Sequence, residues 1–151
     1  MTASTLQAIL PAIILFVTAL AVVTVDLITK RQAKDAQLAG VAVAGLLLAA
    51  VAAFTLVGTT PQPVLDMLVV DGFSTFLMVT VLIGMALVTI YSIETIKRYG
   101  QHRSEYYAFL LAVALAATIA VSANDLLMVY LAMEFLSITS YVLVGFLRGD
   151  K

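Results

Sequence analysis

The sequence predicts an all-α membrane protein, a polytopic bundle of five transmembrane helices. Hydrophobic residues make up 63% of the chain, charged residues only 11%, and the mean hydropathy is +1.11, whereas soluble domains are about 45–50% apolar. Five apolar runs approach the ~20 residues that a helix needs to cross a bilayer. The five runs are separated by polar connections that carry the basic residues. The expected helices cover residues 6–28, 38–57, 73–93, 106–121 and 126–147.

Composition also excludes several classes of function. The net charge is −1 and the basic residues are few and scattered in short clusters, so we expect no nucleic acid as a partner. The chain has no cysteine, hence no disulfide, thiol chemistry or cysteine-held metal, and its single histidine, His102, argues against haem. It has neither a Walker loop nor a dinucleotide fingerprint. We therefore expect no cofactor and no redox chemistry in this chain itself.

The first apolar run begins without a basic residue and is much longer than the core of a signal peptide, which predicts a retained helix over 6–28. Pro11 is expected in its opening turn, where the missing amide proton costs least. Asp26 ends the helix beside Lys30 and Arg31. We interpret it as half of an interfacial ion pair.

The second run, 38–57, is rich in alanine and glycine, and the spacing of Gly40 and Ala44 predicts a close approach to another helix. The connection over 58–72 contains two prolines and then a short aliphatic run at 64–70. Seven residues cannot span a bilayer, so this run predicts an extended or hairpin segment at the interface.

Polar residues before two of the later helices suggest N-caps. Asp71 is the expected cap of the third helix, with Ser74 as the alternative, and Asp125 or Asn124 is expected to cap the fifth. The fourth helix has a core of small residues, ALAATIA, that predicts tight packing beneath the fifth.

The basic residues also predict the orientation in the membrane. With five spans, all of them fall on one side, and the N-terminus and the 58–72 connection fall on the other. The positive-inside rule then places the N-terminus outside and the C-terminus inside. The residues are Lys30, Arg31 and Lys34 after the first helix, Lys97, Arg98 and Arg103 after the third, and Arg148 and Lys151 after the fifth.

One carboxylate, Glu134, lies within the last apolar run. It is eight residues into the run and hence ~12 Å deep, near the bilayer midplane. An acidic side chain at that depth costs roughly 2.5–3.5 kcal/mol on insertion scales, so it should face protein or water. Tyr130, Ser137 and Tyr141 share its helical face and complete a polar stripe. This pattern predicts a proton-relay carboxylate with three residues that line a pathway.

A plainer interpretation remains open for each of these residues. Glu134 can stay protonated, donate a hydrogen bond to a neighbouring helix and fix packing only. Tyrosine hydroxyls within a bundle more often make static hydrogen bonds than conduct protons.

Several segments carry a family resemblance. The run MEFLSITSYVLVGF, preceded by SANDLLMVYLA and followed by RGDK, resembles the fifth transmembrane helix of the antiporter-like subunits of NADH:quinone oxidoreductase (complex I). The similarity is greatest to subunit N of bacteria and its chloroplast and cyanobacterial relatives. ILPAIILFVTALAVVTVDLI and DGFSTF extend it over most of the chain. The resemblance places Glu134 on that helix's key glutamate.

The resemblance implies a proton-translocating membrane-arm subunit, in a bacterial plasma membrane or a thylakoid membrane. Its partners would be the lipid bilayer and other membrane-arm subunits of complex I. NADH or ferredoxin, quinone, flavin and iron–sulfur clusters would belong to partner subunits. Family members are much longer and pair the glutamate with lysines on later helices. We therefore expect the chain to continue beyond Lys151 and a lysine-bearing helix to lie outside this sequence.

Two alternatives keep the membrane fold and change the function. In the first, the chain is a subunit of a multisubunit sodium/proton antiporter, which is related to the same module. A structural membrane subunit that supports assembly would carry no protons at all.

Overall fold

A computed structural model describes residues 3–29, 35–64, 66–96 and 103–146. Within these ranges five helices are long and apolar enough to cross a membrane, which confirms the predicted all-α membrane fold. They begin and end within three residues of the expected ranges. The helices are α1 (Ala3–Ile28), α2 (Asp35–Phe54), α3 (Gly72–Ile96), α4 (Arg103–Ser122) and α5 (Leu126–Phe146).

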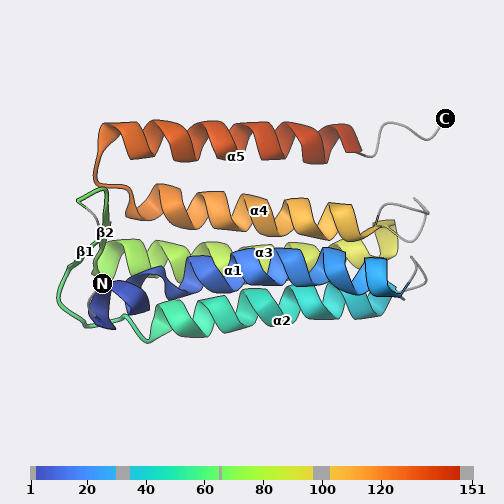
Figure 1. Cartoon of the computed structure of the whole chain (residues 1–151), viewed down its shortest axis with the longest axis horizontal. Helices are drawn as coiled ribbons and strands as arrows, with labels where there is room; N and C mark the ends of the chain where they lie inside the picture. Colours follow the sequence, from blue (N-terminus) through green and yellow to red (C-terminus); the bar gives the residue numbers. More distant parts are fainter. Residues whose placement is uncertain (1–2, 30–34, 65, 97–102, 147–151) are drawn as a thin grey trace.

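The helices lie side by side with their long axes nearly parallel (Figure 1). α1 packs against α2 and α4, and α3 packs against the same two helices. α5 lies at the edge of the bundle beside α4, and among the described residues it makes at most marginal contact with the other elements. The helix that carries Glu134 is therefore the least covered of the five.

A continuous apolar core fills the space among the first four helices. Leu15 and Val22 from α1, Leu46 from α2, Leu82 from α3 and Leu110 from α4 are all at most 1% exposed. In α1 the buried positions recur every three or four residues, as expected for one face of a helix. They are Ala8, Pro11, Leu15, Thr18, Val22 and Asp26.

α1 and α2 approach each other closely at Gly45, and not at the expected pair of small residues. A Cβ atom built on Gly45 of α2 would overlap the side chain of Thr18 in α1. Gly40 and Ala44 are exposed, and a Cβ atom on Gly40 would have no neighbour within 4 Å. No helix of the described chain approaches Gly40 closely, because the pair lies on the outer face of α2.

The connection between α2 and α3 forms the expected hairpin. Strand β1 (Gln62–Val64) pairs antiparallel with β2 (Leu68–Val70). Asp66 in the turn has a φ of 58°, a left-handed conformation that aspartate tolerates better than most side chains. Val64 and Val70 are almost fully buried against the helices. The hairpin thus covers one end of the bundle (Figure 1).

Pro11 lies deeper in its helix than the sequence suggested. α1 begins at Ala3, so Pro11 is in the interior of the helix and not in the opening turn. A proline there cannot donate to the carbonyl four residues before it, which belongs to Gln7. Pro11 is the ninth residue of α1, and it would be the sixth even in a helix that began at Leu6, so the expectation of a place in the opening turn is wrong.

The two predicted caps have different outcomes. At α3, the amide of Ser74 donates to Oδ1 of Asp71 (2.8 Å), and the amide of Asp71 donates to Oγ of Ser74 (2.8 Å), a reciprocal capping box. At α5, neither Asn124 nor Asp125 makes a side-chain hydrogen bond to the first turn of the helix, and both are exposed. Asp125 does occupy the N-cap position, since its carbonyl accepts from the Val129 amide (3.0 Å), but the side-chain bond of a cap is absent there. The Asn124 amide donates to the Met67 carbonyl of the hairpin turn (2.8 Å).

Candidate functional site

The packed face of α5 is formed by small and aliphatic side chains. Ala132 and Thr139 are the buried residues of this helix, each 4% exposed. Leu136 and Leu143 lie on the same face and are half-buried. The Thr139 hydroxyl donates to the Phe135 carbonyl of its own helix (2.7 Å), which leaves an almost wholly apolar surface towards α4.

The predicted polar stripe lies on the opposite face of α5. At ~100° per residue, the centre of Tyr130, Glu134, Ser137 and Tyr141 is about 160° from the centre of the packed face. Exposure agrees with this angle: Tyr130 is 60% exposed and Tyr141 is 75% exposed. Glu134 is exposed and Ser137 is half-buried. The four residues therefore share a face, and that face points away from the rest of the described chain.

The stripe residues do not bond to one another in this structure. Among the described residues, none of the four makes a side-chain hydrogen bond or ion pair. α5 has 21 residues, a length of ~31 Å, and Glu134 lies ~12 Å from its start. A carboxyl group near the middle of a membrane-spanning helix needs a polar partner or water. Any such partner must approach the side of α5 that α4 leaves free.

Both ends of α5 are anchored, one by the hairpin and one by aromatic rings. The turn before the helix pairs with the hairpin through a bridge between Leu68 and Ala123. At the other end, the ring of Phe146 lies 6.2 Å from the rings of both Tyr106 and Phe109 in the first turns of α4. These contacts at the two ends fix the position of α5 along the bundle axis. They thereby fix the depth of Glu134 along that axis.

Asp26 is buried between α1 and α4. The sequence had predicted it as half of an ion pair at the membrane interface. Its side chain is 7% exposed, and its Oδ2 accepts a hydrogen bond from the Ser104 hydroxyl of α4 (2.6 Å). The expected partners, Lys30 and Arg31, lie outside the described residues. The hydrogen bond from Ser104 was not predicted from the sequence. The signal was the buried periodicity of α1, in which Asp26 follows Val22 by four residues.

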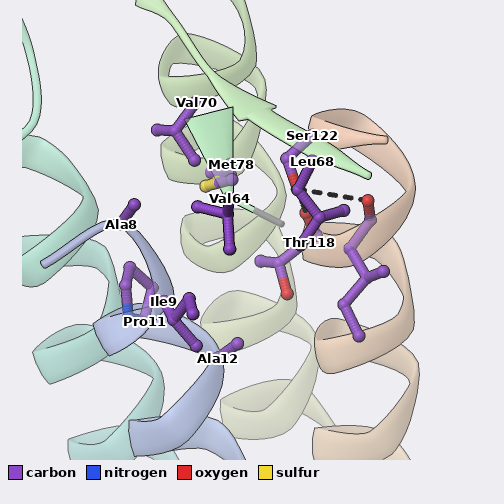
Figure 2. A pocket seen from close by; sticks show the side chains of 11 residues that line it. Ala8, Ile9, Pro11, Ala12, Val64, Leu68, Val70, Met78, Thr118 and Ser122 are labelled. Atoms are coloured by element: carbon purple, nitrogen blue, oxygen red, sulfur yellow. Dashed lines mark hydrogen bonds between the residues drawn. The ribbon is translucent and has the colours of Figure 1, made fainter. Parts of the chain in front are cut away.

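A small cavity lies beneath the hairpin, among α1, α3 and α4 (Figure 2). Its volume is about 30 Å³, and its walls are almost entirely apolar, with Pro11 and Met78 among them. The hydroxyls of Thr118 and Ser122 also line it, and both donate to carbonyls of α4. No titratable side chain lines this cavity, so it offers no proton-binding group.

The chain is similar in sequence to subunits of NADH-quinone oxidoreductases. No family model matches the sequence. The chain is 34% identical, over 94% of its length, to NADH-quinone oxidoreductase subunit N 1 of Solibacter usitatus. It is 36% identical, over 95% of its length, to NADH-quinone oxidoreductase subunit N 2 of Symbiobacterium thermophilum. The chain is homologous to part of subunit N.

The similarity extends to a relative that is named as subunit 2 of an NAD(P)H-quinone oxidoreductase. The chain is 32% identical, over 94% of its length, to NAD(P)H-quinone oxidoreductase subunit 2 of Rippkaea orientalis. In these three matches it spans only 28–30% of the length of the relatives. The resemblance seen in the Glu134 helix thus holds across nearly the whole chain, and subunit N homologues and five apolar helices together identify a multi-pass membrane protein.

Proposed function

We propose that this chain forms part of a proton-translocating membrane-arm subunit of NADH-quinone oxidoreductase. The support is its similarity to subunit N over nearly its whole length. In this proposal other subunits carry electrons from NADH or ferredoxin to quinone through flavin and iron–sulfur clusters. The chain contributes helices and a titrating side chain, with no redox group of its own. The membrane is the bacterial plasma membrane or the thylakoid membrane.

Within that subunit, Glu134 is the proposed proton-relay carboxylate. The observation that carries this role is its position: mid-helix, on the exposed side of α5, with no polar partner among the described residues. A carboxylate that faces a cation within ~4–6 Å is favoured in its charged form, and its proton affinity rises when the cation moves away. The proposed cation is a lysine on a helix outside this sequence. A change in that pairing would load and release a proton.

The test is proton uptake by vesicles that contain the full assembled complex. Glu134→Gln keeps the size and hydrogen-bonding capacity of the side chain and removes its charge, so the complex should assemble and lose most of its NADH-driven or ferredoxin-driven proton uptake. Glu134→Asp should retain part of the uptake because the charge remains. Glu134→Ala should impair both uptake and assembly, since it also removes the polar partner of the proposed lysine.

Tyr130→Phe and Tyr141→Phe are the matched controls on the same stripe. Each keeps the aromatic ring and removes only a hydroxyl, so uptake near the parent rate would leave the relay to Glu134. A fall in uptake would add that hydroxyl to the pathway. A fully assembled Glu134→Gln complex that pumps at the parent rate would leave Glu134 a packing residue. Uptake that requires sodium and persists without quinone reduction would instead indicate an antiporter.

A further inference from the structure

Asp26 is a buried carboxyl group that the proposed relay does not use. It continues the inward stripe of α1 after Thr18 and Val22, and its Oδ2 lies 2.6 Å from the Ser104 hydroxyl. That distance is within the range of O–H···O hydrogen bonds. Ser104 is 5% exposed and is the second residue of α4. Its amide belongs to the first turn, whose N–H groups lack partners within the helix and favour a nearby negative charge.

The first turns of α4 also pack against the last turn of α5. The Phe146 ring packs against Tyr106 and Phe109, two and five residues after Ser104. Among the described residues α4 is the main neighbour of α5, so the placement of α4 determines the placement of α5. A continuous set of contacts therefore runs from Asp26 through Ser104 and the aromatic rings to the helix that carries Glu134.

Hydrogen bonds between helices contribute strongly to the relative placement of helices in a membrane. Helices in a bilayer gain little from hydrophobic burial against one another, because lipid tails are as apolar as their side chains. Packing and interhelical hydrogen bonds then determine how the helices sit. Asp26 and Ser104 form a side-chain hydrogen bond between two different helices. The hydroxyls of Thr89, Ser92, Thr118 and Thr139, by contrast, donate to carbonyls of their own helices.

We propose that Asp26 and Ser104 form a positioning pair that sets α4 and, through it, the location of Glu134. The pair acts at a distance from the stripe and carries no proton itself. Its structural effect stands independently of the relay, and its effect on pumping rests on the function proposed for Glu134.

The experiment measures the distance from α1 to α5 in the full-length subunit within its assembled complex. Spin labels are attached at Thr24→Cys and Val144→Cys, both exposed positions near the same end of the bundle. This chain has no cysteine of its own, and any cysteine elsewhere in the subunit is replaced first. Asp26→Ala and Ser104→Ala should each broaden the distance distribution beyond the parent width, and combining them should add little more.

Two variants separate the bond from general damage to the bundle. Ser92→Ala removes a buried hydroxyl from α3 that donates only to the Thr89 carbonyl of its own helix (2.8 Å), so the distribution should stay at the parent width. Asp26→Asn keeps an oxygen that accepts the Ser104 proton, and should remain closer to the parent than Asp26→Ala. Proton uptake should fall in the order in which the distributions broaden.

An unchanged distribution in both Asp26→Ala and Ser104→Ala would overturn the proposal. Equal broadening in Ser92→Ala would do the same, because any lost buried hydroxyl would then suffice. If Asp26→Ala does not assemble, Ser104→Ala and Asp26→Asn decide the outcome. A Glu134→Gln complex with normal uptake would refute the relay and leave the distance result intact, so the two failures are distinguishable.

Discussion

Three acidic side chains in this chain differ in what surrounds them, and their roles differ accordingly. Asp71 caps the start of α3 in a capping box, Asp26 is buried against a hydroxyl of another helix, and Glu134 is exposed on an apolar helix. A carboxylate accepts hydrogen bonds readily, so the first two are satisfied within the described chain. Glu134 is not, which is why it is the residue through which another segment would act.

The pH dependence of the α3 cap is predictable from its hydrogen bonds. The Ser74 amide, followed by the Ser74 hydroxyl, holds the pKa of the Asp71 carboxyl below its usual value. The folded pKa is therefore lower than the unfolded one, near 3.9. The cap should contribute fully above about pH 4 and lose its contribution as pH falls through the lowered pKa. Hydrogen-exchange protection of amides in the first turn of α3, corrected for the intrinsic exchange rate, measures this loss.

The control for that experiment is Asp71→Asn. Asparagine also caps helices but does not titrate. Protection of the first turn should then be independent of pH between about 2 and 5. The same acid loss in parent and variant would show that the Asp71 charge does not stabilise the start of α3.

At the scale of elements, the contact between α1 and α2 depends on a glycine, Gly45, which has no side chain. Gly45 permits Thr18 to approach so closely that any Cβ would overlap its side chain. Thr18 is 9% exposed and its hydroxyl donates to the Ile14 carbonyl (2.7 Å), so it has little freedom to move away. The two helices would have to separate to admit even a methyl group.

Gly45→Ala should therefore destabilise the folded subunit, by about 1–3 kcal/mol as for other overpacked cores. Thermal unfolding of the purified full-length subunit in nanodiscs measures the effect. Gly40→Ala is the matched control in the same helix, where a Cβ has open space. That change should be neutral or raise the melting temperature, because alanine favours a helix over glycine by roughly 1 kcal/mol. Equal melting temperatures for the two variants would contradict the close contact.

At the scale of the whole molecule, the bundle has two dissimilar ends. The hairpin and the turn before α5 lie at one end, and the far ends of α1 and α5 lie at the other (Figure 1). The basic residues follow α1, α3 and α5 in the sequence. The orientation with the N-terminus outside remains a prediction from that asymmetry.

Cysteine labelling tests this orientation. A cysteine at Thr60, an exposed residue before the hairpin, should react with an impermeant thiol reagent from outside intact cells. A cysteine at Thr29, exposed at the end of α1, should react only after the membrane is opened. Reversed accessibility would place the N-terminus inside. Labelling of both from one side would contradict the five-span topology, since α2 (Asp35–Phe54) crosses the membrane between these two positions.

The sequence alone determined the number of helices, their approximate ends, the hairpin and the polar face of α5. Runs of apolar residues and their spacing are local properties, and the cost of placing backbone polar groups in lipid leaves helices as the only solution for such runs. The reciprocal cap between Asp71 and Ser74 was predictable for the same reason, because both partners lie within four residues.

Only the tertiary structure decided which residues meet across the bundle. It put Gly45, and not Gly40, at a helix contact, joined Asp26 to Ser104 across 78 positions, and placed α4 against the side of α5 opposite Glu134. Helical spacing defines a face but not the neighbour that covers it, since that choice depends on the packing of every helix at once.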